Sequence, residues 1–167
     1  MAEKNQFRGT GVAMVTPFDN TGNVDHDKLI ILTENLISKG VDYLVVLGTT
    51  AETPTLNEQE KKEVIRCVVE ACGGRVPLVV GAGGNNTRAV IEWVRSMDLR
   101  GIDGLLCVVP YYNKPSQEGI YQHYSSIAAV SDLPLMLYNV PGRTGTHMQA
   151  QTVLRLAWDH PDKITAL

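Results

Sequence analysis

Apolar runs typical of β-strands recur along this chain about every 30 residues, and a helical pattern fills each gap between them. The runs begin near Thr10, Asp42, Pro77, Gly104, Pro134 and Lys163. Strands and helices alternating at this interval predict βα units around a parallel sheet. The runs Tyr43–Leu47 and Leu105–Val109 are almost wholly apolar, which is typical of strands covered on both faces.

The predicted helices have recognisable starts and stops. Asp25 and Ser116 can each cap the start of a helix, and Asn57 with Glu60 resembles a capping box. The last helix opens near Gln149. Glycines are expected to end the first three helices: Gly40, Gly73–Gly74 and Gly101.

The number of units limits the architecture. A closed eight-unit barrel typically needs about 250 residues. The 167 residues here supply five full βα units and a sixth strand. Two interpretations remain open at this point: part of a longer barrel, or a smaller doubly wound sheet. No Pro/Ser-rich linker interrupts the chain, so a single domain over residues 1–167 is predicted.

Composition excludes several classes of partner. The net charge is -3 and no Lys/Arg cluster stands out, which argues against a nucleic-acid surface. No apolar stretch approaches the length of a membrane span. The polar start, Met1–Asn5, does not resemble a signal peptide, so a cytoplasmic location is expected.

The spacing of the cysteines and histidines does not predict a metal site. The spacing of Cys67 and Cys72 in a helical pattern does not suit a metal pair. The three cysteines are predicted to be reduced, small apolar core residues: Cys67, Cys72 and Cys107. The four histidines are predicted to be solvated or at helix ends: His26, His123, His147 and His160.

Polar side chains follow several of the predicted strands. Gly48-Thr49-Thr50 comes after the second strand, where consecutive N–H groups and hydroxyls can hold a carboxylate. A simple tight turn is the alternative for this tripeptide. Tyr138 closes the fifth strand and can act as an acid/base or donate to an oxyanion, unless it is a buried tyrosine bound to backbone.

The loops beyond these strands carry two further candidates. Arg143 lies in a loop rich in Pro and Gly and is either a carboxylate-binding fork or a solvated surface residue. The adjacent aromatics Tyr111 and Tyr112 suggest a site wall or a subunit contact, with core packing as the alternative. In a parallel barrel, the C-terminal ends of the strands form the catalytic face. Thr49, Thr50, Tyr138 and Arg143 are therefore predicted to share a single small basin at one rim of the sheet.

Three long motifs together resemble the dihydrodipicolinate synthase (4-hydroxy-tetrahydrodipicolinate synthase) family of pyruvate-dependent Schiff-base aldolases. They are Gly48–Leu56, Pro110–Gly119 and Tyr138–Gly145, and Val15–Phe18 adds to the match. The resemblance implies an α/β fold of the TIM (β/α)8-barrel family, with about five and a half units here and residues 1–167 as its N-terminal portion. It also implies a homo-oligomeric lyase, a tetramer of tight dimers, that needs no cofactor.

The reaction implied by the resemblance condenses pyruvate with L-aspartate 4-semialdehyde in lysine (diaminopimelate) biosynthesis. By match to the motifs, Tyr138 would donate and accept protons. Thr49 and Tyr112 would complete a proton relay, with Tyr112 reaching the neighbouring subunit's site. Thr50 would bind the pyruvate carboxylate, and Arg143 that of the semialdehyde.

The chain departs from the family pattern in three places. Ala51 replaces a common glycine. At the family's lysine-feedback site, Tyr111 and Asn85 match as candidate allosteric or interface residues, whereas three positions differ: Glu58, Lys61 and Ala89. The family's Schiff-base lysine would follow Leu167, and Lys163 lies at the opposite end of its strand. A non-catalytic partial barrel, assembling with other chains or binding small carboxylates, is therefore the alternative function.

Overall fold

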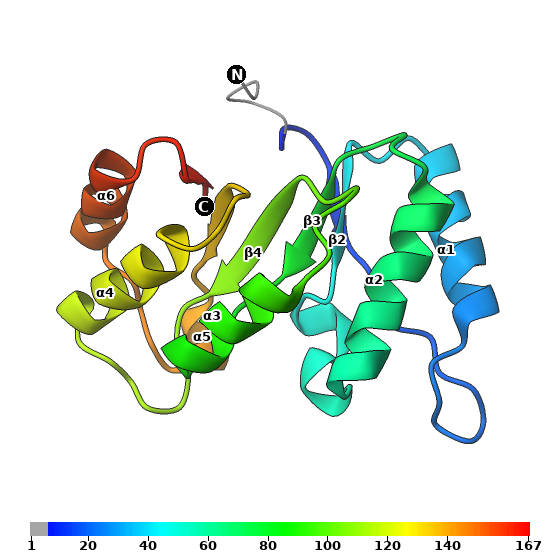
Figure 1. Cartoon of the computed structure of the whole chain (residues 1–167), viewed down its shortest axis with the longest axis horizontal. Coiled ribbons are helices and arrows are strands. Elements are labelled where there is room, and N and C mark those ends of the chain that lie inside the picture. The colour runs from blue at the N-terminus through cyan, green and yellow to red at the C-terminus, as the bar shows by residue number, and fades with distance from the viewer. Residues whose placement is uncertain (1–6) are drawn as a thin grey trace. The chain divides into compact units, whose positions relative to one another are not determined.

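The computed structural model describes residues 7–167, so the predicted features of Met1–Asn5 lie outside the described residues. Strands and helices alternate along the chain as the sequence predicts (Figure 1). The described residues form two compact units, considered separately below. The first runs to Gly81 and includes Leu99–Asp103, and the second holds Ala82–Asp98 and Gly104–Leu167. That residues 1–167 belong to a single domain stays a prediction.

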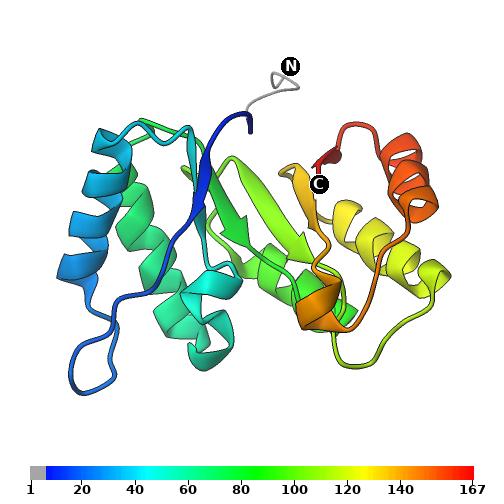
Figure 2. The same cartoon turned by 180° about the vertical axis from the view of Figure 1, so that it is seen from behind.

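Three parallel strands form the centre of the first unit: β1 (Gly11–Ala13), β2 (Tyr43–Val46) and β3 (Leu78–Gly81). In register, Val12 faces Leu44 on β2, and Leu44 faces Leu78 on β3. Two helices, α1 (His26–Ser38) and α2 (Glu58–Cys72), pack against each other (Figure 2). The short 3-10 turns η1 (Thr49–Ala51) and η2 (Thr53–Thr55) connect β2 to α2.

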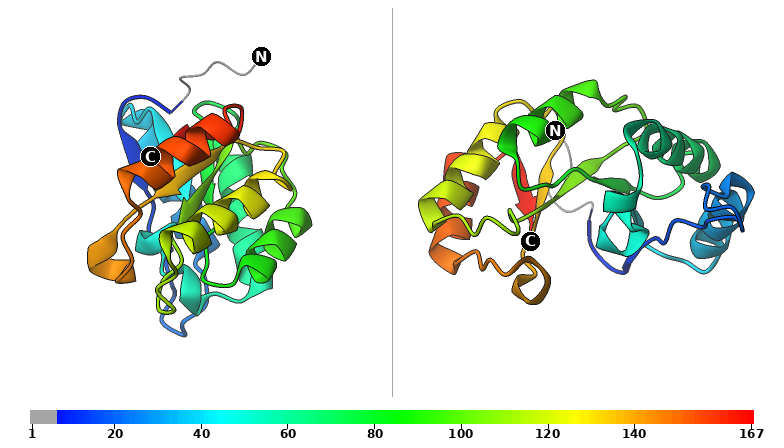
Figure 3. Two further views of the ribbon diagram at one scale, coloured as in Figure 1. Left: turned by 90° about the vertical axis from the view of Figure 1, so that its left-hand side faces the viewer. Right: turned by 90° about the horizontal axis from the view of Figure 1, so that it is seen from below.

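The second unit is also built on three parallel strands: β4 (Gly104–Val108), β5 (Leu135–Tyr138) and β6 (Ile164–Ala166). The register shifts between Leu135 and Met136 where β5 meets β6. The helices are α3 (Thr87–Ser96), α4 (Gln117–Ala128), α5 (Pro141–Thr144) and α6 (Ala150–Asp159). Helix α4 contacts both α3 and α6 (Figure 3).

The predicted helix ends are confirmed except for Gly101, since α3 already ends at Ser96 with Met97 as its C-cap. The Asp25 carboxylate accepts from the Lys28 N–H, and Ser116 caps α4. Asn57 and Glu60 form the expected reciprocal capping box. Gly73 ends α2 in the left-handed conformation, with φ 57°. These local signals explain why the helices begin close to the predicted residues.

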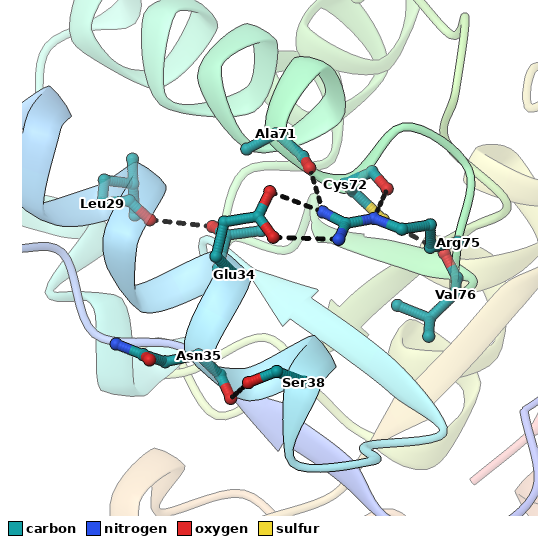
Figure 4. A network of polar contacts seen from close by, with 9 residues as sticks. Leu29, Glu34, Asn35, Ser38, Ala71, Cys72, Arg75 and Val76 are labelled. Atoms are coloured by element: carbon teal, nitrogen blue, oxygen red, sulfur yellow. Dashed lines mark hydrogen bonds and ion pairs between the residues drawn. The ribbon is translucent and has the colours of Figure 1, made fainter.

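An ion pair between Glu34 and Arg75 links α1 to the turn after α2. The Arg75 guanidinium donates to both carboxylate oxygens of Glu34, at 2.9 and 2.7 Å (Figure 4). Arg75 also donates to the carbonyls of Ala71 and Cys72. The hydrogen bond from Arg75 lowers the pKa of the Glu34 carboxyl. One guanidinium thus joins two helices and also satisfies carbonyls at the end of α2.

Buried side chains from the strands and the inner helix faces form the core. All three cysteines are buried free thiols, as predicted. Burial raises the pKa of the Cys107 thiol to about 12, which suits an inert core residue. The buried Tyr124 on α4 donates its hydroxyl to the Cys107 carbonyl on β4, at 2.8 Å. This bond satisfies a phenol that would otherwise be buried without a partner.

The prediction for the histidines is wrong for His123. This residue lies in α4 and is only 4% exposed. It shares the buried stripe of Ile120, Tyr124 and Ile127, which the helical spacing places on one face. Its Nδ1 lies 2.8 Å from the Thr87 hydroxyl, whereas its Nε2 has no hydrogen-bond partner in residues 7–167.

Within residues 7–167, no helix is both long and apolar enough to cross a membrane. The same residues contain no group of three or more His, Cys, Asp or Glu side chains that could share a metal ion.

Candidate active site

The segment after β2 is a compact turn with unusual backbone angles. Leu47, directly after the strand, has φ 55°, and Glu52, beyond η1, has φ 54°. Left-handed angles cost a non-glycine residue roughly 1–2 kcal/mol each, so the surrounding structure must hold them. The Thr16 hydroxyl donates to the Ala51 carbonyl at 2.8 Å, and the Thr53 hydroxyl to the Gly48 carbonyl at 2.9 Å.

Thr49 and Thr50 differ from the two threonines that hold this turn. Both are exposed, and neither hydroxyl has a hydrogen-bond partner within the described part of the chain. Gly48-Thr49-Thr50 does form part of a tight turn, but the hydroxyls that bind its backbone carbonyls belong to Thr16 and Thr53. The hydroxyls of Thr49 and Thr50 remain available to a ligand at the C-terminal end of β2.

Tyr138 is the last residue of β5, at the C-terminal end where the sequence predicts chemistry. Its carbonyl accepts the Val109 N–H at 2.9 Å, which fixes its backbone to the neighbouring strand. The side chain is half-buried, and its hydroxyl has no hydrogen-bond partner among residues 7–167. The buried tyrosine with a backbone-bound hydroxyl is Tyr124, so that alternative does not describe Tyr138.

Arg143 lies on α5, a short helix where the sequence predicts an irregular rigid loop. Pro141 starts this helix and Gly145 ends it with φ 64°. Proline suits the first helical position and glycine the left-handed end, so these two residues are the signal that the prediction overlooked. Arg143 is exposed, and no carboxylate in residues 7–167 forms an ion pair with it.

Tyr111 and Tyr112 lie in the loop between β4 and α4. The Tyr112 side chain is 88% exposed and its φ is 73°. A positive φ is an outlier for a bulky residue. Asn113 donates from its side chain to the Asn85 carbonyl at 3.2 Å, and from its N–H to the Tyr111 carbonyl at 2.9 Å. Asn113 therefore joins the segments of Tyr111 and Asn85, the two predicted allosteric or interface residues.

The second unit thus contains Tyr138, Arg143 and the Tyr111–Tyr112 pair, all at or beyond the C-terminal ends of strands. Thr49 and Thr50 occupy the equivalent position in the first unit. That these residues line one basin stays a prediction. Lys163 lies just before β6, where its ammonium donates to the Ser131 carbonyl at 2.6 Å. It is at the end where the strand begins, as expected.

Burial changes the acid–base behaviour of His123. Desolvation lowers the pKa of this imidazole to about 4, so it is neutral near pH 7. Its burial is not predicted above, although its place in the apolar stripe of α4 indicates it. Neutral His123 and Thr87 join α4 to the start of α3, close in sequence to Asn85.

Comparison with known proteins gives consistent matches over nearly the whole chain. The model of the dihydrodipicolinate synthetase family matches residues 6–166. The 4-hydroxy-tetrahydrodipicolinate synthase of Parabacteroides distasonis is 57% identical over 94% of this chain and 52% of its own. The Bacillus subtilis enzyme of that name is 49% identical over 95% of this chain and 54% of its own. The chain therefore spans about half the length of these relatives.

Solved structures agree with the sequence relatives. Dihydrodipicolinate synthase from Thermotoga maritima has a TM-score of 0.90 and 43% identity, covering 94% of this chain and 53% of its own. The chloride-inhibited enzyme from Acinetobacter baumannii, complexed with pyruvate, has a TM-score of 0.88 and 43% identity, covering 95% and 53%. The predicted fold class, part of a TIM (β/α)8 barrel, is confirmed. The chain belongs to the dihydrodipicolinate synthetase family.

Proposed function

We propose that the whole protein containing this chain is a 4-hydroxy-tetrahydrodipicolinate synthase, a lyase acting in lysine (diaminopimelate) biosynthesis. Its substrates are pyruvate and L-aspartate 4-semialdehyde. Family membership is the observation that carries this proposal. The hydroxyls of Thr49, Thr50 and Tyr138 and the guanidinium of Arg143 support it. None of these groups has a partner among residues 7–167, and each lies at or just beyond the C-terminal end of a strand.

The proposed reaction starts on the lysine expected directly after Leu167. Its amine attacks the ketone carbon of pyruvate, and loss of water gives an imine. Loss of a methyl proton converts the imine to an enamine, which forms a carbon–carbon bond to the aldehyde carbon of the semialdehyde. The aldehyde oxygen gains a proton in that step. Neither step needs a metal or an organic cofactor.

The residues of this chain would bind the substrates and move protons. Tyr138 accepts and returns protons during imine formation and the aldol step, helped by Thr49 and Tyr112. Thr50 binds the pyruvate carboxylate. Arg143 binds the carboxylate of the semialdehyde, for which a guanidinium offers a two-point hydrogen-bonding fork.

Tyr112 is proposed to act in the site of a neighbouring subunit. Its ring is 88% exposed on a backbone with φ 73°. A side chain held outward at such a conformational cost favours a role in contact with another molecule. From the resemblance to the family, we further propose a homo-oligomer arranged as a dimer of tight dimers and located in the cytoplasm. One solved relative is described as the first monomeric variant, so the assembly must be measured for this protein.

Trapping of the imine tests the proposed function. We expect the full-length protein, incubated with pyruvate and borohydride, to gain one covalently attached pyruvate in intact-mass measurements. Arg143→Ala should be labelled normally, because its guanidinium is assigned to the other substrate. An unlabelled full-length protein would contradict the imine mechanism. A purified species of only 18.3 kDa that is not labelled would instead support the partial barrel that binds carboxylates without catalysis.

A further inference from the structure

The side chain of Asn139, next to Tyr138, closes the loop that carries Arg143. Its Oδ1 accepts the Met148 N–H at 3.1 Å, and its Nδ2 donates to the Met148 carbonyl at 3.2 Å. Nδ2 also lies 3.3 Å from Nδ1 of His147. The amide exchanges two hydrogen bonds with one residue, as a neighbouring strand would. It therefore joins the start of the loop, directly after β5, to its end.

The loop closed in this way is ordered internally as well. The Thr144 hydroxyl donates to the Thr146 carbonyl at 2.8 Å and accepts from the Thr146 N–H at 3.3 Å. Met148 is 2% exposed, so the end of the loop is anchored in the core. Arg143 itself is exposed and has no ion-pair partner in the described chain. Its position accordingly depends on the loop.

A second amide, from α4, holds the far side of the same loop. Gln117 donates to the His147 carbonyl at 2.8 Å. It accepts the Gln149 N–H at 3.0 Å and the Thr152 hydroxyl at 2.6 Å. Gln117 therefore fixes the segment leading into α6. Asn139, in contrast, adjoins Tyr138 in the chain and binds the end of the loop through Met148.

We propose that Asn139 is a positioning residue for the second substrate, L-aspartate 4-semialdehyde. It fixes the position of the Arg143 guanidinium relative to the Tyr138 phenol. The inference rests on the proposed function, in which Arg143 binds the carboxylate of L-aspartate 4-semialdehyde. A two-point contact between guanidinium and carboxylate depends strongly on position, and a displacement of about 1 Å can cost about 100-fold in rate. Imine formation with pyruvate does not use Arg143 and should not depend on Asn139.

The test is a double-mutant cycle in the full-length enzyme. We expect Asn139→Ala to lower kcat/KM for the semialdehyde about 10- to 100-fold, mainly through KM. In an Arg143→Ala background, the same change should cost less than about 3-fold, because the residue through which Asn139 acts is gone. The rate of pyruvate labelling with borohydride should stay at the wild-type level in Asn139→Ala.

Two further variants complete the design. Gln122→Ala removes an exposed amide of α4 whose hydrogen bond within residues 7–167 is to the Glu118 carboxylate, so it should leave the kinetics of both substrates unchanged. Asn139→Asp keeps the acceptor for the Met148 N–H but cannot donate to the Met148 carbonyl, and it replaces Asn139→Ala if the alanine variant does not fold. It should also raise the semialdehyde KM.

The outcomes separate this inference from the proposed function. A wild-type enzyme that pyruvate and borohydride do not label overturns the proposed function, and the inference with it. Normal labelling with an unchanged semialdehyde KM in Asn139→Ala overturns the inference alone. Equal losses with and without Arg143, or a matching loss of pyruvate labelling, would show general structural damage and also overturn it.

Discussion

The carbonyl oxygen of Leu47 occupies the space where a side chain on Gly81 would begin. Leu47 has φ 55°, and this angle belongs to the turn that presents Thr49 and Thr50. Gly81 ends the adjacent strand β3. The absence of a Cβ on β3 is thus what allows the backbone after β2 to turn where it does.

We expect Gly81→Ala to destabilise the protein by about 1–3 kcal/mol, because the new Cβ overlaps backbone that cannot rotate away. Urea unfolding followed by circular dichroism measures the change. Gly142→Ala is the matched control, since an added Cβ there meets nothing within 4 Å and the residue has no positive φ. A loss of stability in Gly142→Ala as large as in Gly81→Ala would contradict the steric explanation.

His123 should make stability depend on pH. Its folded pKa of about 4 lies below the ordinary value of 6.5 because of burial, so the unfolded state binds the proton more readily. The stability linked to neutral His123 is fully present above about pH 6.5 and is lost as pH falls toward 4. The loss in unfolding free energy amounts to about 2 kcal/mol by pH 5.

His123→Gln removes the titrating group and tests whether stability falls with pH because of it. The difference in unfolding free energy between pH 7 and pH 5 should be smaller in the variant than in the wild type by about 2 kcal/mol. Equilibrium unfolding in urea at both pH values measures it. Ser126→Ala provides the control, because it removes a non-titrating side chain of the same helix and should retain the wild-type pH dependence. Parallel pH profiles for wild type and His123→Gln would refute the prediction.

Tyr124→Phe should cost about 1–3 kcal/mol of stability. The change leaves the buried Cys107 carbonyl without the phenol that donates to it at 2.8 Å. Tyr121→Phe removes an equally short bond, 2.8 Å to the Asp159 carboxylate, but at the surface. Thermal unfolding should therefore show a larger decrease in Tm for Tyr124→Phe, and the reverse order would argue against burial as the cause.

Tyr112→Gly separates the effect of backbone strain on stability from the proposed role of the phenol in turnover. Glycine tolerates the φ of 73° at this position, so we expect stability to stay the same or rise by up to about 1 kcal/mol. Under the proposed function, the turnover of the full-length enzyme should nevertheless fall at least about 10-fold, because the relay loses its phenol. Unimpaired turnover would remove Tyr112 from the mechanism.

The sequence predicts the repeating elements well because each has a local cause. Asp25, Asn57 with Glu60, and Ser116 cap helices wherever the chain folds, and the apolar runs need burial on both faces. The short helix at Pro141 was missed because four residues carry no periodic pattern.

The backbone angles around the candidate site could not be predicted. Leu47, Glu52, Tyr112 and Lys114 all have positive φ, which their residue types do not favour. Tertiary contacts impose these angles, such as the fit of Leu47 over Gly81. The types of residue at the strand ends were predictable, whereas the amide that closes the Arg143 loop became evident only from its distances to Met148.

The outward ring of Tyr112 bears on how the protein should be assayed. If a phenol from one copy completes the proton relay of another, then dilution removes part of the catalyst without unfolding anything. Specific activity would fall as the enzyme concentration drops below the dissociation constant of the complex, and it would recover on concentrating the sample. Under the proposed function, turnover of this enzyme would thereby report on its self-association.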